Sequence, residues 1–352
     1  NDPLRRYIKS TPENGALSPE VYELVNKTLA HRDVCSRKPL YKQYDAVVRG
    51  MTTIPRGYAD AGVLAPIPGS RLGVALGVAG NPRQGTVNAN LAAQHAVLAA
   101  VQKVIAVGAQ PVALTDCLNF GNPNDPVQYG DLAASVEGLA QAGFRLGLPF
   151  VSGNVSLYNE SRAGAVPASP IVACVGTIGD ISKVVTPGFK REASTVFHVG
   201  ALQNAMGSSV VAELLEQDGG PLPSIDYPAE LRRIRFMREC LERGAILSVA
   251  TIADGGLFPA LVRQIEFSGT PTTVDLRNRD RPGHVGYVEA FFSETSGWIV
   301  EVPDAAAFKQ LASECGLVTD DYNEIGQIDE AGSFDLAELR GAWSSPLAAI
   351  YA

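Results

Sequence analysis

Residues 114–123, with the sequence LTDCLNFGNP, combine a carboxylate, two amides and a glycine in a pattern typical of a ligand-binding loop. We expect a buried strand to end at Asp116, and α/β folds place ligand contacts at that end of a strand. The Asp116 carboxylate suits Mg²⁺ or a nucleotide hydroxyl, and Asn119 and Asn122 offer amide groups beside it. The alternative is that Asp116 and Asn119 only cap turns. The residue types alone leave both interpretations open.

A second candidate is the segment 151–160, VSGNVSLYNE. Gly153 permits a close approach of the backbone to a ligand. The side-chain oxygen of Asn154 suits a hard metal ion, and the Ser156 hydroxyl can bond a phosphate oxygen. An ordinary transition from strand to loop explains the same residues, so two interpretations remain open here as well.

Two further segments carry weaker signals. Residues 253–257, ADGGL, place Asp254 and two glycines at the start of a helix, which suits an anion or a metal–phosphate pair but is also a common helix start. Residues 292–297, FSETSG, place Glu294 just before a strand, and the spacing alone favours a solvated turn glutamate.

No catalytic residue is predicted in this chain. The four histidines are isolated, and His95, in an apolar helix, favours a packing role. The sequence contains neither G-x-x-x-x-G-K-[ST] nor G-x-G-x-x-G, which argues against P-loop and Rossmann chemistry.

The elements that must position these segments alternate between strand and helix, which predicts an α/β fold with a sheet covered by helices. A break near residues 182–193, where Pro187-Gly188 interrupts a charged stretch, predicts a domain boundary. We expect a helical connector over 1–50, whose helix begins at Ser18 and runs to His31, a first α/β domain over 51–181 and a second over 182–352. The expected strands are 71–80, 110–116, 149–152, 170–178, 195–200, 297–302 and 323–328, and the expected helices are 90–107, 131–146, 208–216, 228–243, 257–267 and 304–315.

The composition is that of a folded enzyme. The chain has 352 residues, 46% of them hydrophobic, and 29 Lys+Arg minus 37 Asp+Glu leave a net charge of −8, which argues against nucleic acid as a partner. Polar residues interrupt the most apolar stretch, 91–114, which argues against a membrane span. Five scattered cysteines without a CxxC motif favour a reducing cytoplasm. From the start at Asn1 we expect a fragment or a processed product.

Five segments together resemble one family: LTDCLNFGNP at 114–123, SGNVSLYNE at 152–160, TPGFK at 186–190, ADGGL at 253–257 and FSE at 292–294. They occur in this order in the C-terminal half of the phosphoribosylformylglycinamidine synthase family. The connector YKQYDAVVRG at 41–50 and the turn GNPR at 80–83 fit the same region. The resemblance covers about residues 20–330.

The resemblance implies an ATP-dependent ligase of purine biosynthesis. In that reaction ATP phosphorylates the amide oxygen of formylglycinamide ribonucleotide, and ammonia derived from glutamine displaces the phosphate to give the amidine. Each half of such an enzyme is similar to aminoimidazole ribonucleotide synthetase. A small α/β domain joins its strands to those of a partner half, or of a second copy, in a barrel, and a larger α/β domain follows.

The resemblance also implies roles for individual residues. Asp116 and Gly153 fall on nucleotide-contacting positions, Asn154 on a Mg²⁺ position and Ser156 on a substrate-contacting position. The implied cofactors are ATP and Mg²⁺. The implied partners are the N-terminal half of the same enzyme, a glutaminase subunit and a small accessory subunit. Asp254 and Glu294 match the metal and ligand loops of the half-repeat more loosely.

The chain also departs from the family pattern. Ala79 stands where this half usually carries an aspartate before GNPR, and Asn88-Ala89 and Leu91-Ala92 replace Asp-Pro and Gly-Gly pairs. Residues 250–253, which include Thr251, replace a His-Asp-Val-Ser run. These losses argue against metal binding on the ADGGL side. The family's catalytic histidine and main Mg²⁺ carboxylates belong to the N-terminal half.

Three functions remain open at this point. The leading one is half of the amidine-forming ligase, the second is a catalytically degenerate structural or nucleotide-binding half, and the third is a free-standing kinase or cyclo-ligase that acts as a homodimer. The resemblance to aminoimidazole ribonucleotide synthetase implies an open strand edge in the small domain, and the apolar segments 73–80 and 170–179 would make an open sheet expose hydrophobic surface as well. Without the other half we expect a two-fold dimer through this domain, unless residues 1–50 fold over the edge.

Overall fold

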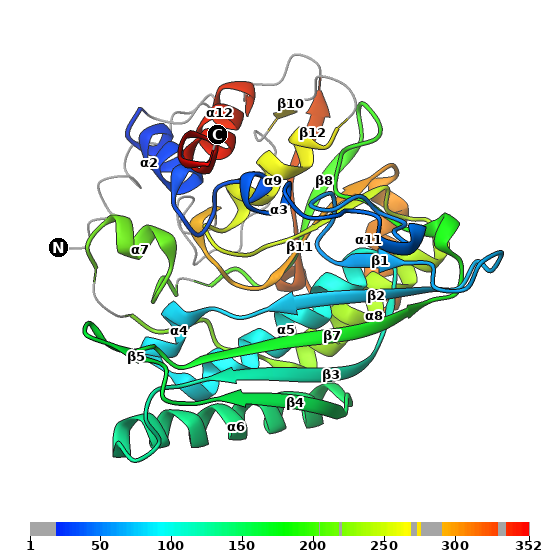
Figure 1. Cartoon of the computed structure of the whole chain (residues 1–352). Coiled ribbons are helices and arrows are strands. Elements are labelled where there is room, and N and C mark those ends of the chain that lie inside the picture. The colour runs from blue at the N-terminus through cyan, green and yellow to red at the C-terminus, as the bar shows by residue number, and fades with distance from the viewer. Residues whose placement is uncertain are drawn as a thin grey trace.

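Two five-stranded sheets organise the computed structural model, one below the other in the view of Figure 1. The structure describes residues 19–203, 205–217, 220–268, 273–275, 291–329 and 336–351. Ser18, the expected start of the first helix, lies outside these residues. None of the described helices is long and apolar enough to cross a membrane.

The first sheet has the strand order β1-β2-β7-β3-β4, and only β3 and β4 run parallel. Helices α5 (Ala89–Ala106) and α6 (Pro126–Leu146) pack against one face of this sheet (Figure 1). The strands are β1 (Gly62–Leu64), β2 (Gly73–Ala79), β3 (Gln110–Asn119), β4 (Phe150–Ser156) and β7 (Ser169–Ile178).

Alternation along the strands decides which side chains meet the helices. Ala75, Val172 and Cys174 are fully buried on the helix-covered face. Their neighbours Leu76 and Ile171 point the other way and are 47% and 38% exposed. The sheet therefore has one packed face and one open face, and the open face is apolar along β2 and β7.

The second sheet has the order β10-β12-β8-β11-β9 and is antiparallel throughout. Helices α8 (Tyr227–Arg243) and α11 (Ala305–Glu314) cover one face, where the rings of Phe236 and Phe308 lie 4.9 Å apart. Helices α2 (Pro19–Ala30), α9 (Leu257–Glu266) and α12 (Leu336–Ile350) cover the other. The strands are β8 (Thr195–Gly200), β9 (Ser248–Thr251), β10 (Thr273–Asp275), β11 (Gly297–Val302) and β12 (Tyr322–Asp329).

The remaining described elements are short. They are α3 (Lys38–Tyr41), α4 (Pro82–Val87), α7 (Val210–Leu214), the 3₁₀ turns η1 (Val48–Gly50), η2 (Ile181–Lys183) and η3 (Thr319–Asp321), and the hairpin of β5 (Glu160–Ser161) and β6 (Gly164–Ala165).

A single hydrophobic core joins the two sheets. Side chains of α5, such as Val97 and Val101, belong to the same cluster as Trp298 of β11 and Phe236 of α8. The Trp298 indole N–H donates to the Gln102 carbonyl at 3.0 Å in the buried interior. The boundary expected near residue 182 separates the two sheets in sequence, but their cores are continuous.

The structure corrects several expected elements. We call each sheet with its covering helices a unit. Helix α2 was expected to belong to a connector, but its Leu24 and Val25 pack in the core of the second unit against α9 and α12. The turn expected at Asn81 is the start of α4, because the Asn81 side chain accepts from the N–H groups of Arg83 and Gln84. Strand β3 continues three residues beyond Asp116.

Candidate functional site

Asp116 and Gly153 lie side by side on the parallel strands β3 and β4. A Cβ atom at Gly153 would stand 2.7 Å from both carboxylate oxygens of Asp116, so the glycine makes room for that carboxylate. The backbone N–H of Asn154 hydrogen-bonds to the carboxylate, while burial raises its pKa above the usual range. Asp116 therefore lies within a paired strand, beside a glycine that leaves space for its carboxylate, rather than in a loose turn.

Asn154 and Ser156 point to the opposite face of the sheet. The Asn154 Nδ2 lies 3.6 Å from the Cys117 Sγ, and Ser156 pairs in register with Asn119. Leu114, which alternates with these residues on β3, is fully buried on the helix side. Asp116 and Asn154 thus face opposite sides, and this arrangement does not bring them to one ion. Their assignments to nucleotide and metal stay predictions.

The two amides of the first motif have local partners. Asn122 Oδ1 accepts from the N–H of Asn124 at 2.9 Å, which is the turn-capping role. Asn119 Nδ2 donates to the Ser169 carbonyl on β7 at 3.3 Å. The Asn119 side chain lies with Asn154 on the open face of the sheet, whereas Asp116 lies on the other face. The sequence motif grouped Asn119 with Asp116.

A second candidate site is a cavity of about 90 Å³ between the two units. From the first unit, Ala79, Gln84 and Lys103 line it. From the second unit, Asp254 and Glu294 line it. The two weaker candidates from the sequence therefore lie together, at the junction of the units and away from the Asp116 motif.

Arg83, from the first unit, bonds to several residues across this junction. Its Nη2 lies 2.7 Å from Asp254 Oδ1 and 3.6 Å from Glu294 Oε2, and its Nη1 pairs with Asp33. Its Nε donates to the Ser208 carbonyl at 3.0 Å. One guanidinium at the start of α4 thus binds the connector after α2 and three loops of the second unit, at Ser208, Asp254 and Glu294.

Glu294 is buried, so the expectation of a solvated turn glutamate is wrong. Its side chain is 6% exposed, and its Oε1 accepts from the N–H groups of Val210 at 2.7 Å and Gly255 at 2.8 Å. Burial, followed by the nearby Asp254 carboxylate, raises the pKa of Glu294 to about 7. Burial also raises the pKa of Asp254, and the Arg83 charge opposes that shift. The cost of burial is offset by these hydrogen bonds, which local spacing could not predict.

Lys103 and Asp60 complete the junction, and sequence reasoning missed both. The Lys103 Nζ donates to the Val78 carbonyl at 2.7 Å, and burial lowers the pKa of this amine. The Asp60 carboxylate accepts from the Thr251 N–H at 2.8 Å and from Arg263 at 2.7 Å. The sequence signal that could have identified Lys103 is a charged residue within a helix that otherwise packs against a sheet.

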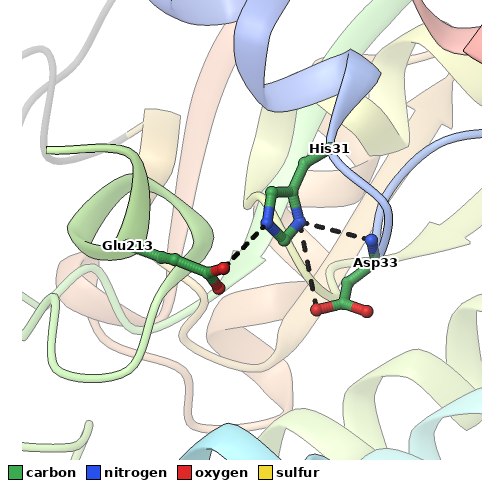
Figure 2. Close-up of side chains that lie close together, drawn as sticks. All are labelled: His31, Asp33 and Glu213. Carbon is green, nitrogen blue, oxygen red and sulfur yellow. Dashed lines mark hydrogen bonds and ion pairs between the residues drawn. The ribbon is translucent and has the colours of Figure 1, made fainter. Parts of the chain in front are cut away.

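His31, Asp33 and Glu213 form a cluster at the edge of this junction (Figure 2). Their nearest ligand atoms lie within 4.8 Å of one another, a spacing that a metal ion could bridge. Arginines already pair with both carboxylates: Arg83 with Asp33, and Arg32 with Glu213 at 2.7 Å. The His31 Nδ1 also accepts from the Asp33 N–H at 3.2 Å. The cluster is an ion-pair network in this structure.

Both units match known domain families. Residues 58–178 match the model of the AIR synthase related protein, N-terminal domain, and residues 194–337 match that of the C-terminal domain. The chain contains both domains of the AIR synthase-related family.

This two-domain chain is 35% identical over 338 residues to the phosphoribosylformylglycinamidine synthase subunit PurL of Methanothrix thermoacetophila. It is 36% identical over 338 residues to the subunit of the same name in Thermomicrobium roseum. These alignments cover 91% and 93% of the chain but 44% and 45% of the relatives. The chain therefore spans about half the length of the curated relatives it matches.

Solved structures share the fold. PurL of Thermotoga maritima complexed with AMPPCP gives a TM-score of 0.57 at 22% identity and covers 84% of this chain and 41% of that one. The HypE–HypF complex gives 0.58 at 18% identity, with 78% and 88% covered. The α/β fold expected from the sequence, with two AIR synthase-like domains, is confirmed.

Proposed function

We propose that this chain supplies one half of an ATP-dependent ligase that converts formylglycinamide ribonucleotide to formylglycinamidine ribonucleotide in purine biosynthesis. The observation that carries the proposal is the alignment of nearly the whole chain with less than half of subunits named for that synthase. ATP and Mg²⁺ are the proposed cofactors and the cytoplasm the proposed compartment. A glutaminase subunit would supply ammonia, and a small accessory subunit would join the assembly.

The open face of the first sheet supports a half-molecule role. Leu76 and Val78 of β2 are both 47% exposed, and Ile171 of β7 continues the apolar surface. Apolar sheet faces of this kind are normally covered by a partner. The second half of the enzyme, or a second copy of this chain, would cover this face and close the barrel.

We propose separate tasks for the two sides of the β3–β4 pair, which face in opposite directions. Asp116 and Gly153 would contact the nucleotide from the helix-covered side. Asn154 would hold Mg²⁺ and Ser156 would contact the substrate from the open side, where the partner half arrives. A nucleotide in contact with all four would have to bind at the end of the strand pair, so we expect the site to be completed only by the other half.

The decisive experiment is reconstitution. The purified chain alone should form no amidine from formylglycinamide ribonucleotide, ATP and ammonia, because the resemblance places the catalytic histidine and the main Mg²⁺ carboxylates in the N-terminal half. Addition of the separately expressed N-terminal half from the same gene should restore turnover. Robust turnover by the chain alone would refute the half-enzyme proposal, and the absence of an upstream homologous half in the gene would favour a free-standing homodimer.

Site variants test the assignments within the reconstituted pair. Asp116→Ala and Asn154→Ala should each weaken Mg²⁺–adenine nucleotide binding by about tenfold or more, as expected for loss of a charge-assisted contact. Asn122→Ala, which removes only a turn cap, is the matched control and should bind like wild type. Wild-type affinity in both test variants would show that the assignment is wrong.

A second candidate function is a structural half that turns nothing over. The observation that favours it is the cavity between the units, where Ala79 and Thr251 stand at positions that carry acidic residues in the pattern of the resemblance. In that case, substitution of residues that line the cavity should leave the reconstituted enzyme fully active. Loss of turnover on Asp116→Ala in the reconstituted pair would contradict a purely structural role for this chain.

A further inference from the structure

The groups that line the cavity between the two units do not fit a divalent metal ion. Among the described residues that line it, Asp254 and Glu294 are the two carboxylates. Asp254 Oδ1 already accepts from Arg83 and, at 2.9 Å, from Asn81. Glu294 Oε1 already accepts two backbone N–H groups. The second oxygen of Glu294, Oε2, faces the Arg83 Nη2 at 3.6 Å, so an ion bound there would meet the guanidinium charge.

A second cation lies within the cavity wall. The Lys103 side chain is half-buried there and makes one described hydrogen bond, to the Val78 carbonyl. It interacts electrostatically with Asp254 and with Asp60, and the latter is already paired with Arg263. A divalent ion in this space would be repelled by the positive charges of both Arg83 and Lys103.

The neutral groups of the cavity fit water better than an ion. Gln84 and Thr251 are 7% and 2% exposed, and their side-chain oxygens Oε1 and Oγ1 have no hydrogen-bond partner. A cavity of about 90 Å³ holds a few water molecules, which can satisfy both oxygens. Nucleotide pockets need several times this volume.

We propose that Arg83 and Lys103 act as resident cations that replace a metal ion at the junction of the two units. The junction then binds neither Mg²⁺ nor a metal–nucleotide pair, and its carboxylates serve to join the units. This inference does not depend on the proposed ligase function, since it concerns metal binding by the chain itself.

The first test is a Mn²⁺ titration of the full chain, followed by electron paramagnetic resonance, with Asp254→Asn for comparison. Both proteins should bind the same number of ions, whatever binds elsewhere, and added ADP should not create a difference. One Mn²⁺ more on wild type than on Asp254→Asn would overturn the proposal.

The second test asks whether removal of the resident charge opens the site. Lys103→Met combined with Ala79→Asp should gain one Mn²⁺ site with at least tenfold higher affinity than the control, Ala79→Asp alone, which keeps the lysine. If the double variant does not fold, as judged by circular dichroism, Lys103→Met with Thr251→Asp takes its place, with Thr251→Asp alone as control. Equal Mn²⁺ binding by the folded variants with and without Lys103 would show that Lys103 does not exclude the metal.

Discussion

Arg83 brings together carboxylates that come from three distant parts of the chain. Its side chain is only 17% exposed, so its removal takes away the ion-pair partner of Asp254 and of the buried Glu294. Loss of one partner of a buried ion pair is costly because the other charge stays desolvated. The residue therefore determines how firmly the two units hold together.

We expect Arg83→Met to lower the free energy of unfolding by about 2–4 kcal/mol, measured by urea denaturation. Arg71→Met is the control, because the Arg71 side chain is 74% exposed in its ion pair with Asp180 and such pairs contribute at most about 1 kcal/mol. Equal effects of the two substitutions would contradict the role given to Arg83.

His198 is a buried histidine without a hydrogen-bond partner for either ring nitrogen. Burial, and then the nearby Arg233 charge, lower its pKa to about 3, well below the ordinary value of about 6.5. The unfolded chain takes up this proton at a higher pH than the folded chain. Stability from the neutral ring is therefore complete above about pH 6.5 and is lost as pH falls toward 3.

Comparison of wild type with His198→Gln isolates this effect. The unfolding free energy of wild type, relative to the variant, should fall by about 2 kcal/mol between pH 7 and pH 5, since one pKa unit corresponds to about 1.4 kcal/mol. Chemical denaturation at four pH values would measure it. Parallel pH curves for the two proteins would mean that His198 does not resist protonation in the fold.

At the scale of elements, the close packing of α5 on α6 depends on Gly138. A Cβ atom there would stand 2.2 Å from the Asn90 carbonyl of α5. Gly130, on the same helix α6, has no atom within 4 Å of such a Cβ. The two glycines therefore differ in packing but share the helical backbone.

Opposite effects are expected from the same substitution. Gly138→Ala should destabilise the protein by about 1–3 kcal/mol because the helices must separate. Gly130→Ala should stabilise it by up to about 1 kcal/mol through helix propensity. Thermal melting of both variants beside wild type distinguishes them, and stabilisation by Gly138→Ala would rule out the close contact.

The sequence predicts the helices and strands that have a clear run or period of apolar residues, but it does not predict short elements such as β9 and the start of α4. The extents of β8 and β11 match their apolar runs, while α6 begins five residues before the expected 131, at the Asp125 cap and Pro126. The Asn81-Pro82 pair is the same kind of helix start as Ser18-Pro19, yet it was interpreted as a turn. Strand β9 has only four residues, too few for a periodic signal.

The site was predictable only in part, for a similar reason. Asp254 and Glu294 could be selected from loops before a helix and a strand, but Arg83 lies 171 positions from Asp254. No local pattern reports such a contact. The separation of Asp116 from Asn154 depends on the β3–β4 register, which pairs Asp116 with Gly153 and so turns Asn154 to the other face. Alternation within each strand does not give this register.

At the scale of the whole molecule, the open sheet face predicts self-association. Light scattering at micromolar concentration should give about twice the 37.1 kDa of one chain. Leu76→Glu, on the open face, should shift the mass to that of one chain. Phe144→Glu is the control, since Phe144 is 85% exposed on α6, away from that face. A monomeric wild type would contradict the prediction.

Cys117 offers an independent measure of the same surface. It lies on the open face beside Asn154, and the other four cysteines are buried. Its reaction with a thiol reagent should slow as protein concentration rises, and Leu76→Glu should abolish that dependence. A rate independent of concentration in wild type would show that this face stays uncovered.

The indole of Trp298 carries a consequence for cooperativity. Its hydrogen bond to the Gln102 carbonyl lies within the core that both sheets share, so neither sheet can lose its packing while the other keeps it. Two domains in sequence should then melt as one cooperative unit, with equal calorimetric and van't Hoff enthalpies. The first domain expressed alone would expose the side of α5 that meets Trp298 and would not reach its native stability. The boundaries of the two family domains would then mark evolutionary units, while the cooperative folding unit is the pair of domains.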